Sequence, residues 1–193
     1  VEWNSTLTYT INRNKIKKLL KPTTLKDGLL VEQDMLDLDG VGNVKTRLFE
    51  GGSVGDLYVT ALRTDEHGYI DVDYVNNTVS VDGNAGERGD GWIYAGNSQA
   101  KYTMGWRNSF SWKGLTLGFL INARVGGVCV SMTQALMDSY GTSKATADAR
   151  DAGGVMINGY LVPAAQKYYQ TVGTGAGSMY VYSATNIRLA ELS

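Results

Sequence analysis

The sequence predicts an all-β fold of antiparallel strands, and three observations carry this prediction. Residues 102–125 alternate between apolar and polar side chains on both sides of a central Lys-Gly pair, as the two strands of a hairpin do. Glycine is frequent with 24 residues, proline occurs only twice, and 12 tyrosines and 4 tryptophans favour strands. No apolar run approaches the roughly 18 residues that a membrane-spanning helix needs.

The composition argues against several classes of function. The 18 basic and 19 acidic residues are balanced, so no nucleic-acid partner is expected. A single cysteine, Cys129, rules out an internal disulfide, and one histidine, His67, leaves little basis for a metal site. We find no catalytic constellation in the sequence, which therefore predicts neither an enzyme nor a cofactor.

The first part of the chain combines one clear strand with weaker signals. Residues 1–12 alternate and predict a strand, and a basic stretch, Lys15 to Lys21, follows. Residues 56–64 and 69–73 predict a hairpin around the turn 65–68.

The second part predicts three short helices and a final strand. The helices are expected at 132–140, at 143–152 from a Thr or Ser cap, and at 163–172 between Pro163 and Gly173. Residues 180–193 predict the last strand.

The hairpin at 102–125 has strands of eleven residues, about twice the usual length in soluble proteins. Pairing Trp112 with Leu115 across Lys113-Gly114 separates its side chains into two faces. The face predicted to touch lipid holds Met104, Trp106, Phe110, Trp112, Leu115, Leu117, Phe119 and Ile121. The opposite face is predicted to line a lumen. Its residues are Thr103, Arg107, Asn122 and Arg124 of the hairpin, together with Arg188 of the last strand.

Two fold interpretations follow from this hairpin. At a tilt near 45°, eleven residues climb about 25 Å, which is the height of the apolar band of an outer-membrane barrel. An arginine facing lipid costs about 2–4 kcal/mol, and both hairpin arginines lie on the other face. The predicted fold is therefore a fragment of a large antiparallel transmembrane β-barrel, with long extracellular loops that contain short helices. The alternative is a soluble all-β carbohydrate-binding module, in which a second sheet buries the apolar face.

The alternation slips at the end of the last strand. Ile187 and Leu189 share the apolar phase, but Glu191 then falls in that phase and Leu192 outside it. One extra residue restores the phase, so the sequence predicts a β-bulge within 189–192 or an end of lipid contact at Leu189.

Several segments, in the same order along the chain, resemble one protein family. They are WNSTLTYTINRNKI (3–16), GGSVGDLY (51–58), DEHGYI (65–70), residues 95–127, residues 131–155, QKYYQTVG (166–173) and YVYSATNIRLAELS (180–193). Together they resemble the C-terminal part of the barrel in SusC/RagA-type TonB-dependent outer-membrane transporters of Bacteroidetes. Ala100 and Ala190 depart from the proline and arginine that are usual in this family.

The resemblance implies that 1–193 is part of one barrel domain that imports glycan fragments or peptides across the outer membrane. It implies a SusD-like surface lipoprotein as a partner, and energy from TonB through an N-terminal part that precedes this segment. The signal peptide and plug domain of such a protein are also expected before residue 1. The short turn at 113–114 is then expected to be periplasmic, and 126–180 and most of 13–101 extracellular, although 56–73 could hold a pair of spans.

Two sets of residues, one polar and one aromatic, each have two possible roles. Arg107, Asn122 and Arg124 either solvate the lumen and pair with carboxylates, or contact the passing substrate. The loop aromatics either stack on sugar rings or pack the loops; they are Trp92, Tyr94, Tyr160, Tyr168 and Tyr169.

Overall fold

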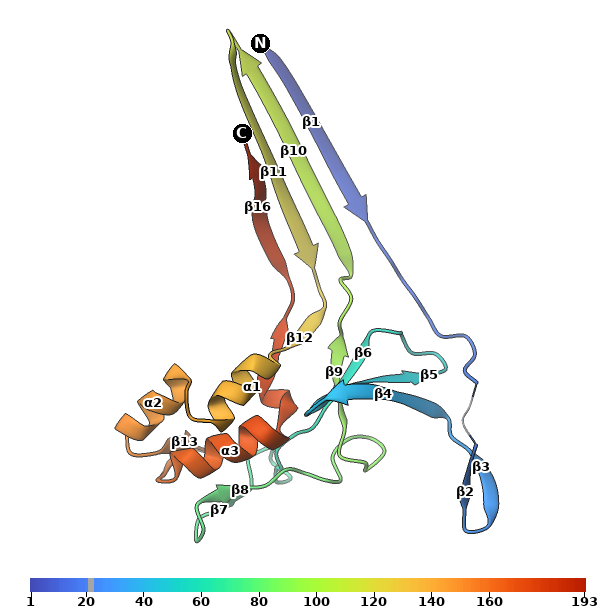
Figure 1. The fold of residues 1–193 in the computed structure, drawn as a ribbon, viewed down its shortest axis with the longest axis vertical. Helices are drawn as coiled ribbons and strands as arrows, with labels where there is room; N and C mark the ends of the chain where they lie inside the picture. Colours follow the sequence, from blue (N-terminus) through green and yellow to red (C-terminus); the bar gives the residue numbers. More distant parts are fainter. Residues whose placement is uncertain (21–22) are drawn as a thin grey trace.

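The computed structural model describes residues 1–20 and 23–193, so Lys21 of the basic stretch lies outside the described residues. The chain is mostly β with antiparallel sheets, which confirms the all-β prediction; no closed barrel forms among these residues. A long, narrow sheet extends from a lobe that contains the helices (Figure 1). None of the described helices is both long and apolar enough to cross a membrane.

The long sheet has four antiparallel strands in the order β1-β10-β11-β16. They are β1 (Glu2–Thr10), β10 (Tyr102–Trp112), β11 (Leu115–Val125) and β16 (Asn186–Leu192). β10 and β11 pair without a break from Trp112–Leu115 to Tyr102–Val125, which is the predicted register. Lys113 and Gly114 both have positive φ, 46° and 84°, as a tight two-residue hairpin turn requires.

The predicted bulge is present in β16. Ile121 pairs with Leu189 and Leu120 pairs with Glu191, so Ala190 is the extra residue. Leu192 then lies opposite Phe119 on the apolar face, while Glu191 returns to the polar face. The prediction of a bulge within 189–192 is confirmed.

The lobe contains a second four-stranded sheet, ordered β4-β5-β6-β9, and several strand pairs. The sheet consists of β4 (Met35–Val41), β5 (Val44–Phe49), β6 (Asp56–Val59) and β9 (Ile93–Asn97). The pairs are β2 (Thr23–Lys26) with β3 (Leu29–Glu32), β7 (Val72–Asp73) with β8 (Thr78–Val79), β12 (Val128–Val130) with β15 (Val181–Ser183), and β13 (Val155–Ile157) with β14 (Tyr160–Val162).

Two strand predictions need correction. The predicted hairpin of 56–64 with 69–73 is reduced to a bridge between Thr64 and Ile70, because β6 pairs with β5 and β9 instead. With four residues, β6 is too short for a membrane span, so the possible pair of spans in 56–73 is wrong. The last predicted strand is interrupted after Ser183 and resumes at Asn186.

The three predicted helices are present. Ser131 caps α1 (Met132–Ser139) and Ser143 caps α2 (Lys144–Asp151) through their side-chain oxygens. The third helix, α3 (Ala165–Gly175), continues past the predicted end at Gly173, and the short 3₁₀-helix η1 (Gly177–Tyr180) follows. Gly173 lies inside α3 rather than at its end, and its lack of a side chain allows the close contact with α1. A Cβ there would overlap the Ala135 carbonyl oxygen and lie 2.8 Å from the Ser139 Cβ.

The hydrophobic core lies in the lobe, where segments distant in sequence meet around α3. It contains Leu62, Val79, Ala135, Ile157, Val162, Tyr168, Val172, Ala176 and Tyr180. The buried Tyr180 hydroxyl donates a 3.0 Å hydrogen bond to Asp138 of α1. Burial, together with this carboxylate, raises the pKa of Tyr180 far above its usual value.

Gly173→Ala should weaken the packing of α1 against α3, because the new methyl group overlaps the α1 backbone. We expect the free energy of opening of these helices to fall by about 1–3 kcal/mol, measured by hydrogen exchange of their amides. Gly83→Ala is the control, since a Cβ there meets nothing within 4 Å. An equal loss of protection in both variants would contradict the close contact.

Candidate functional site

The long sheet presents two chemically different faces, and the polar face forms a hollow near the lobe. Two rows of paired residues line it: Thr10, Thr103, Arg124 and Asn186 in one row, and Thr8, Gly105, Asn122 and Arg188 in the next. The hollow has a volume of about 470 Å³. The structure thus brings together four of the five residues predicted to line a lumen, Thr103, Asn122, Arg124 and Arg188.

The hollow is cationic and rich in hydrogen-bonding groups. The Arg124 Nη2 donates to the Ser98 carbonyl oxygen at 2.8 Å, which fixes that guanidinium at the edge next to the lobe. Within residues 1–20 and 23–193, Arg188 makes no hydrogen bond or ion pair through its side chain, and no carboxylate lines the hollow. Two guanidinium groups surrounded by hydroxyls and amides can bind carboxylate, phosphate or hydroxyl groups.

Gly105 creates part of this space. A Cβ at this position would lie 2.8 Å from the Thr8 hydroxyl and 3.2 Å from the Asn122 amide oxygen, so both side chains occupy space that any other residue would need. The sequence predictions missed four of the residues that line the hollow, Thr8, Thr10, Gly105 and Asn186. A glycine in the polar phase of a long strand, opposite two polar residues, is the signal that would have indicated them.

Arg107, the fifth predicted lumen residue, lies one row away from the hollow and is paired. Its Nη2 donates to the Glu191 carboxylate at 2.7 Å, and both side chains are about half exposed. The pairing across Leu120 depends on the bulge at Ala190, which returns Glu191 to this face. Of the two interpretations of Arg107, the structure favours pairing with a carboxylate over direct contact with a substrate.

The other face of the sheet is apolar, and the described part of the chain leaves it uncovered. All eight residues predicted to touch lipid lie on this face. Trp106, Phe110, Trp112 and Leu117 are 42–51% exposed, and Trp3, Leu7 and Leu189 of the neighbouring strands are more exposed still. Contact with lipid stays a prediction.

Two polar residues interrupt the apolar face, and each bonds a tryptophan. The Trp3 indole N–H donates to the Asn108 side-chain oxygen at 3.1 Å, and the Trp106 indole N–H donates to the Ser5 hydroxyl at 3.0 Å. Asn108 is only 4% exposed beneath the surrounding rings. These contacts satisfy both indole donors within the sheet, so neither needs a water partner on this face.

The lobe holds an aromatic pocket of about 520 Å³. Tyr58, Trp92 and Tyr94 line it together with the acidic residues Asp56 and Glu87. The rings of Tyr58 and Tyr94 pack edge to face, with their centres 5.6 Å apart. The Lys45 ammonium lies 4.0 Å from the centre of the Trp92 ring. Of the aromatics singled out in the sequence, Trp92 and Tyr94 line this pocket, whereas Tyr168 and Tyr169 belong to or pack on the core. Tyr160 is exposed to solvent, and its ring packs edge to face on that of Tyr74.

A buried ion-pair cluster lies beside the aromatic pocket. Arg47, whose side chain is 3% exposed, donates to Asp37 at 2.8 Å and to Asp90 at 2.6 Å. Burial opposes ionisation of both carboxyl groups, but the hydrogen bonds from Arg47 outweigh it and hold the pKa of Asp37 and of Asp90 below the usual value. The cluster fastens the turn-rich loop 82–92 to β5.

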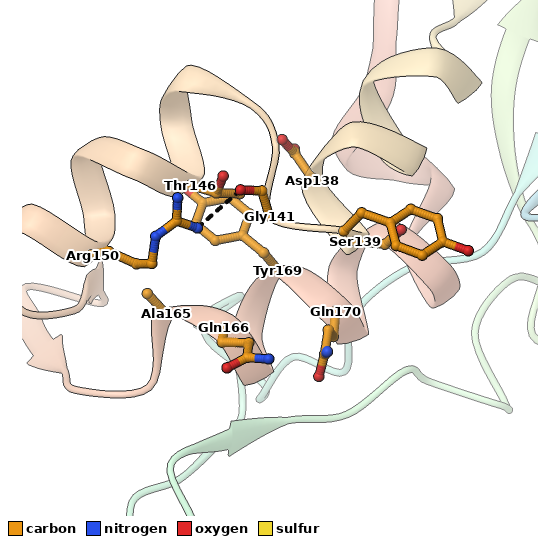
Figure 2. A pocket seen from close by; sticks show the side chains of 10 residues that line it. Asp138, Ser139, Gly141, Thr146, Arg150, Ala165, Gln166, Tyr169 and Gln170 are labelled. Carbon is orange, nitrogen blue, oxygen red and sulfur yellow. Dashed lines mark hydrogen bonds between the residues drawn. The ribbon is translucent and has the colours of Figure 1, made fainter.

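A third, smaller hollow of about 240 Å³ lies among the helices of the lobe (Figure 2). Its wall includes Arg150 of α2, Tyr169 and Gln166 of α3, and Asp138 of α1. Arg150 Nη1 donates to the Gly141 carbonyl oxygen at 3.0 Å, which ties α2 to the turn after α1. We assign this hollow to packing within the lobe.

No family model matches the chain, and no curated protein matches it. Among the described residues, no group of three or more His, Cys, Asp or Glu side chains has an arrangement that could hold a metal ion.

The Arg47 cluster predicts a pH dependence confined to acid. Because the pKa values of Asp37 and Asp90 are lowered on folding, their stabilising effect is complete above the ordinary value of 3.8 and is lost as the pH falls through the lower folded values. We expect the hydrogen-exchange protection of loop 82–92 to be constant between about pH 6 and 4.5 and to fall below about pH 4. The double variant Asp37→Asn/Asp90→Asn should show low protection that no longer changes in this range. A wild-type loss centred near neutral pH would contradict the assignment.

Proposed function

We propose that this chain is part of the barrel wall and extracellular loops of a SusC/RagA-type TonB-dependent transporter in the outer membrane of a Gram-negative bacterium. In this role it imports glycan fragments or peptides, with a SusD-like lipoprotein and TonB as partners. The observation that carries the proposal is the long sheet, with an uncovered apolar face on one side and a cationic, polar hollow on the other.

The aromatic residues of the apolar face support a membrane setting. Trp3, Phe110 and Trp112 lie near the hairpin turn, and Tyr9 and Tyr102 lie at the lobe end, where their rings are 5.3 Å apart. Barrels carry such aromatic girdles at the two interfaces of an apolar band about 25 Å high. In a transporter, the apolar face then meets hydrocarbon and the hollow faces the lumen.

The alternative, a soluble carbohydrate-binding module, needs a second sheet over the apolar face. No strand of residues 1–20 or 23–193 packs there, and exposure of eight or more large apolar side chains in one patch is costly in water. The alternative therefore has less support than the barrel wall.

A matched pair of substitutions tests the orientation of the sheet. Leu120 and Ile121 are adjacent in β11, have isomeric side chains and lie on opposite faces of the sheet. Ile121 pairs with Trp106 on β10, and Leu120 pairs with Arg107. We expect Ile121→Arg to lower the free energy of unfolding in lipid vesicles by about 2–4 kcal/mol, because the charge enters hydrocarbon. Leu120→Arg should cost less than about 1 kcal/mol, since the new guanidinium faces water beside Glu191. Equal costs, or a larger cost at Leu120, would contradict the face assignment.

Substrate uptake tests the transporter itself. We expect cells that carry the protein to deplete particular oligosaccharides or peptides from the medium, and a protonophore that removes the inner-membrane energy source should stop the depletion. The variant Arg124→Gln/Arg188→Gln should lower uptake about tenfold at limiting substrate, because charged hydrogen bonds are lost. Arg63→Gln, an exposed cation of the lobe, is the control. Uptake that persists after deletion of the gene, or without inner-membrane energy, would refute the proposal.

A further inference from the structure

Exposed cations gather where the apolar face of the long sheet meets the lobe. Arg13, Lys15, Lys17 and Lys18 follow the end of β1 within eight residues, and Lys101 immediately precedes β10. All five are exposed, and among the described residues none of them forms an ion pair. We refer to these five residues as the basic band. The nearby carboxylate Glu50 accepts a hydrogen bond from the Leu19 backbone N–H rather than pairing with the band.

Two residues of the basic band contribute to the wall of a cleft that also has apolar and aromatic side chains in its wall. Arg13 and Lys101 line a cleft of about 610 Å³ together with Tyr9, Ile11 and Tyr102. Tyr9 and Tyr102 lie on the apolar face of the sheet, in its last rows before the lobe. The cleft therefore joins an apolar part, continuous with the apolar face, to a cationic part.

The backbone that carries the basic band is held in place. The Ile16 N–H donates to the Gly52 carbonyl oxygen at 2.9 Å, and the Gly51 N–H donates to the Ile16 carbonyl oxygen at 2.8 Å. The Asn14 side-chain oxygen accepts from the Ser53 hydroxyl and the Val54 N–H. Gly126 leaves room for the Lys101 side chain, because a Cβ there would lie 2.7 Å from the Lys101 Cγ. The cations thus project from an anchored segment rather than from a free tail.

The chemistry of this cleft selects an anionic amphiphile. Fixed cations beside an apolar membrane surface attract phosphate groups of lipids, while tyrosine rings and aliphatic stems suit the boundary between headgroup and hydrocarbon. A free phosphate ion would use the cations and leave the apolar part of the cleft empty. A neutral lipid would use the apolar part and leave the cations unpaired.

We propose that the cleft lined by Arg13, Lys101, Tyr9 and Tyr102 binds the phosphorylated headgroup of a membrane lipid in the leaflet on the lobe side. This proposal rests on the proposed function, since it requires the apolar face to lie in a membrane. It adds a lipid site to the outer surface of the sheet, on the side opposite the lumen-facing hollow.

Fluorescent phosphatidylglycerol, diluted into neutral detergent micelles, provides the probe, and its binding to the purified full-length protein is read by anisotropy. We expect it to bind more tightly than phosphatidylcholine and more weakly as salt rises. Arg13→Gln/Lys101→Gln should weaken the binding of phosphatidylglycerol about 25-fold, or about fivefold per cation, and leave that of phosphatidylcholine unchanged. Lys15→Gln/Lys17→Gln should also weaken the binding of phosphatidylglycerol. Lys26→Gln/Lys113→Gln removes the same charge from exposed sites elsewhere. This control variant should leave the binding of both lipids unchanged.

Three outcomes would overturn the lipid site. They are equal binding of the two lipids, equal losses in the site and control variants, and displacement of the probe by inorganic phosphate at the same concentration, which would indicate a phosphate site instead. Any of them can occur while the Ile121→Arg and uptake experiments succeed, so the lipid site can fail alone. Recovery of the full-length protein in water without detergent would instead remove the membrane function on which it rests.

Discussion

The pairing of β10 with β11 is the constraint on which the rest of the long sheet depends. Side chains in a strand alternate with a period of two, so a slip of one residue in this pairing would exchange the faces of a whole strand. The two-residue turn at Lys113-Gly114, with both φ values positive, excludes such a slip. Because the register is fixed, Arg107 and Arg124 share one side with Asn122, while Trp106 and Phe110 lie on the other. The outer strands β1 and β16 then adopt the same division when they pair with this hairpin.

The bulge at Ala190 shows how the division is maintained where the sequence departs from alternation. Without it, Glu191 would lie opposite Phe119 on the apolar face, two residues beyond Leu189, and a carboxylate in an apolar environment is costly. With it, Glu191 reaches Arg107 across β11 at 2.7 Å. The bulge could be predicted from the sequence because a phase slip is a local signal. The partner of Glu191 could not, because it depends on which strands become neighbours, and 84 residues separate the two.

The same distinction explains what else the sequence could and could not predict. The hairpin register, the first strand, the presence of the three helices and the cap of α2 follow from local patterns, and these agree with the structure. The lobe sheet does not follow from such patterns, since its strands have four to seven residues and little alternation. Its stability comes from non-local contacts, such as the insertion of Arg47 between Asp37 and Asp90. For the hollow, four residues could be assigned to the right face, but its shape depends on Gly105 and on two threonines of β1 that lie nearly a hundred residues earlier.

The edges of the long sheet bear on the proposal that it is part of a barrel wall. β1 and β16 each pair on one side only, so their outer edges present unpaired backbone N–H and C=O groups. Soluble proteins protect such edges with prolines, lysines or very short strands, yet β1 has nine residues with neither proline nor lysine among them. In hydrocarbon, where water cannot pair these groups, each unpaired group costs several kcal/mol, and only a closed ring of strands removes the cost. If the sheet is a barrel wall, both edges must therefore be continued by further strands. The exposed apolar face and the open edges are then two consequences of one architecture, because lipid covers the face and neighbouring strands cover the edges.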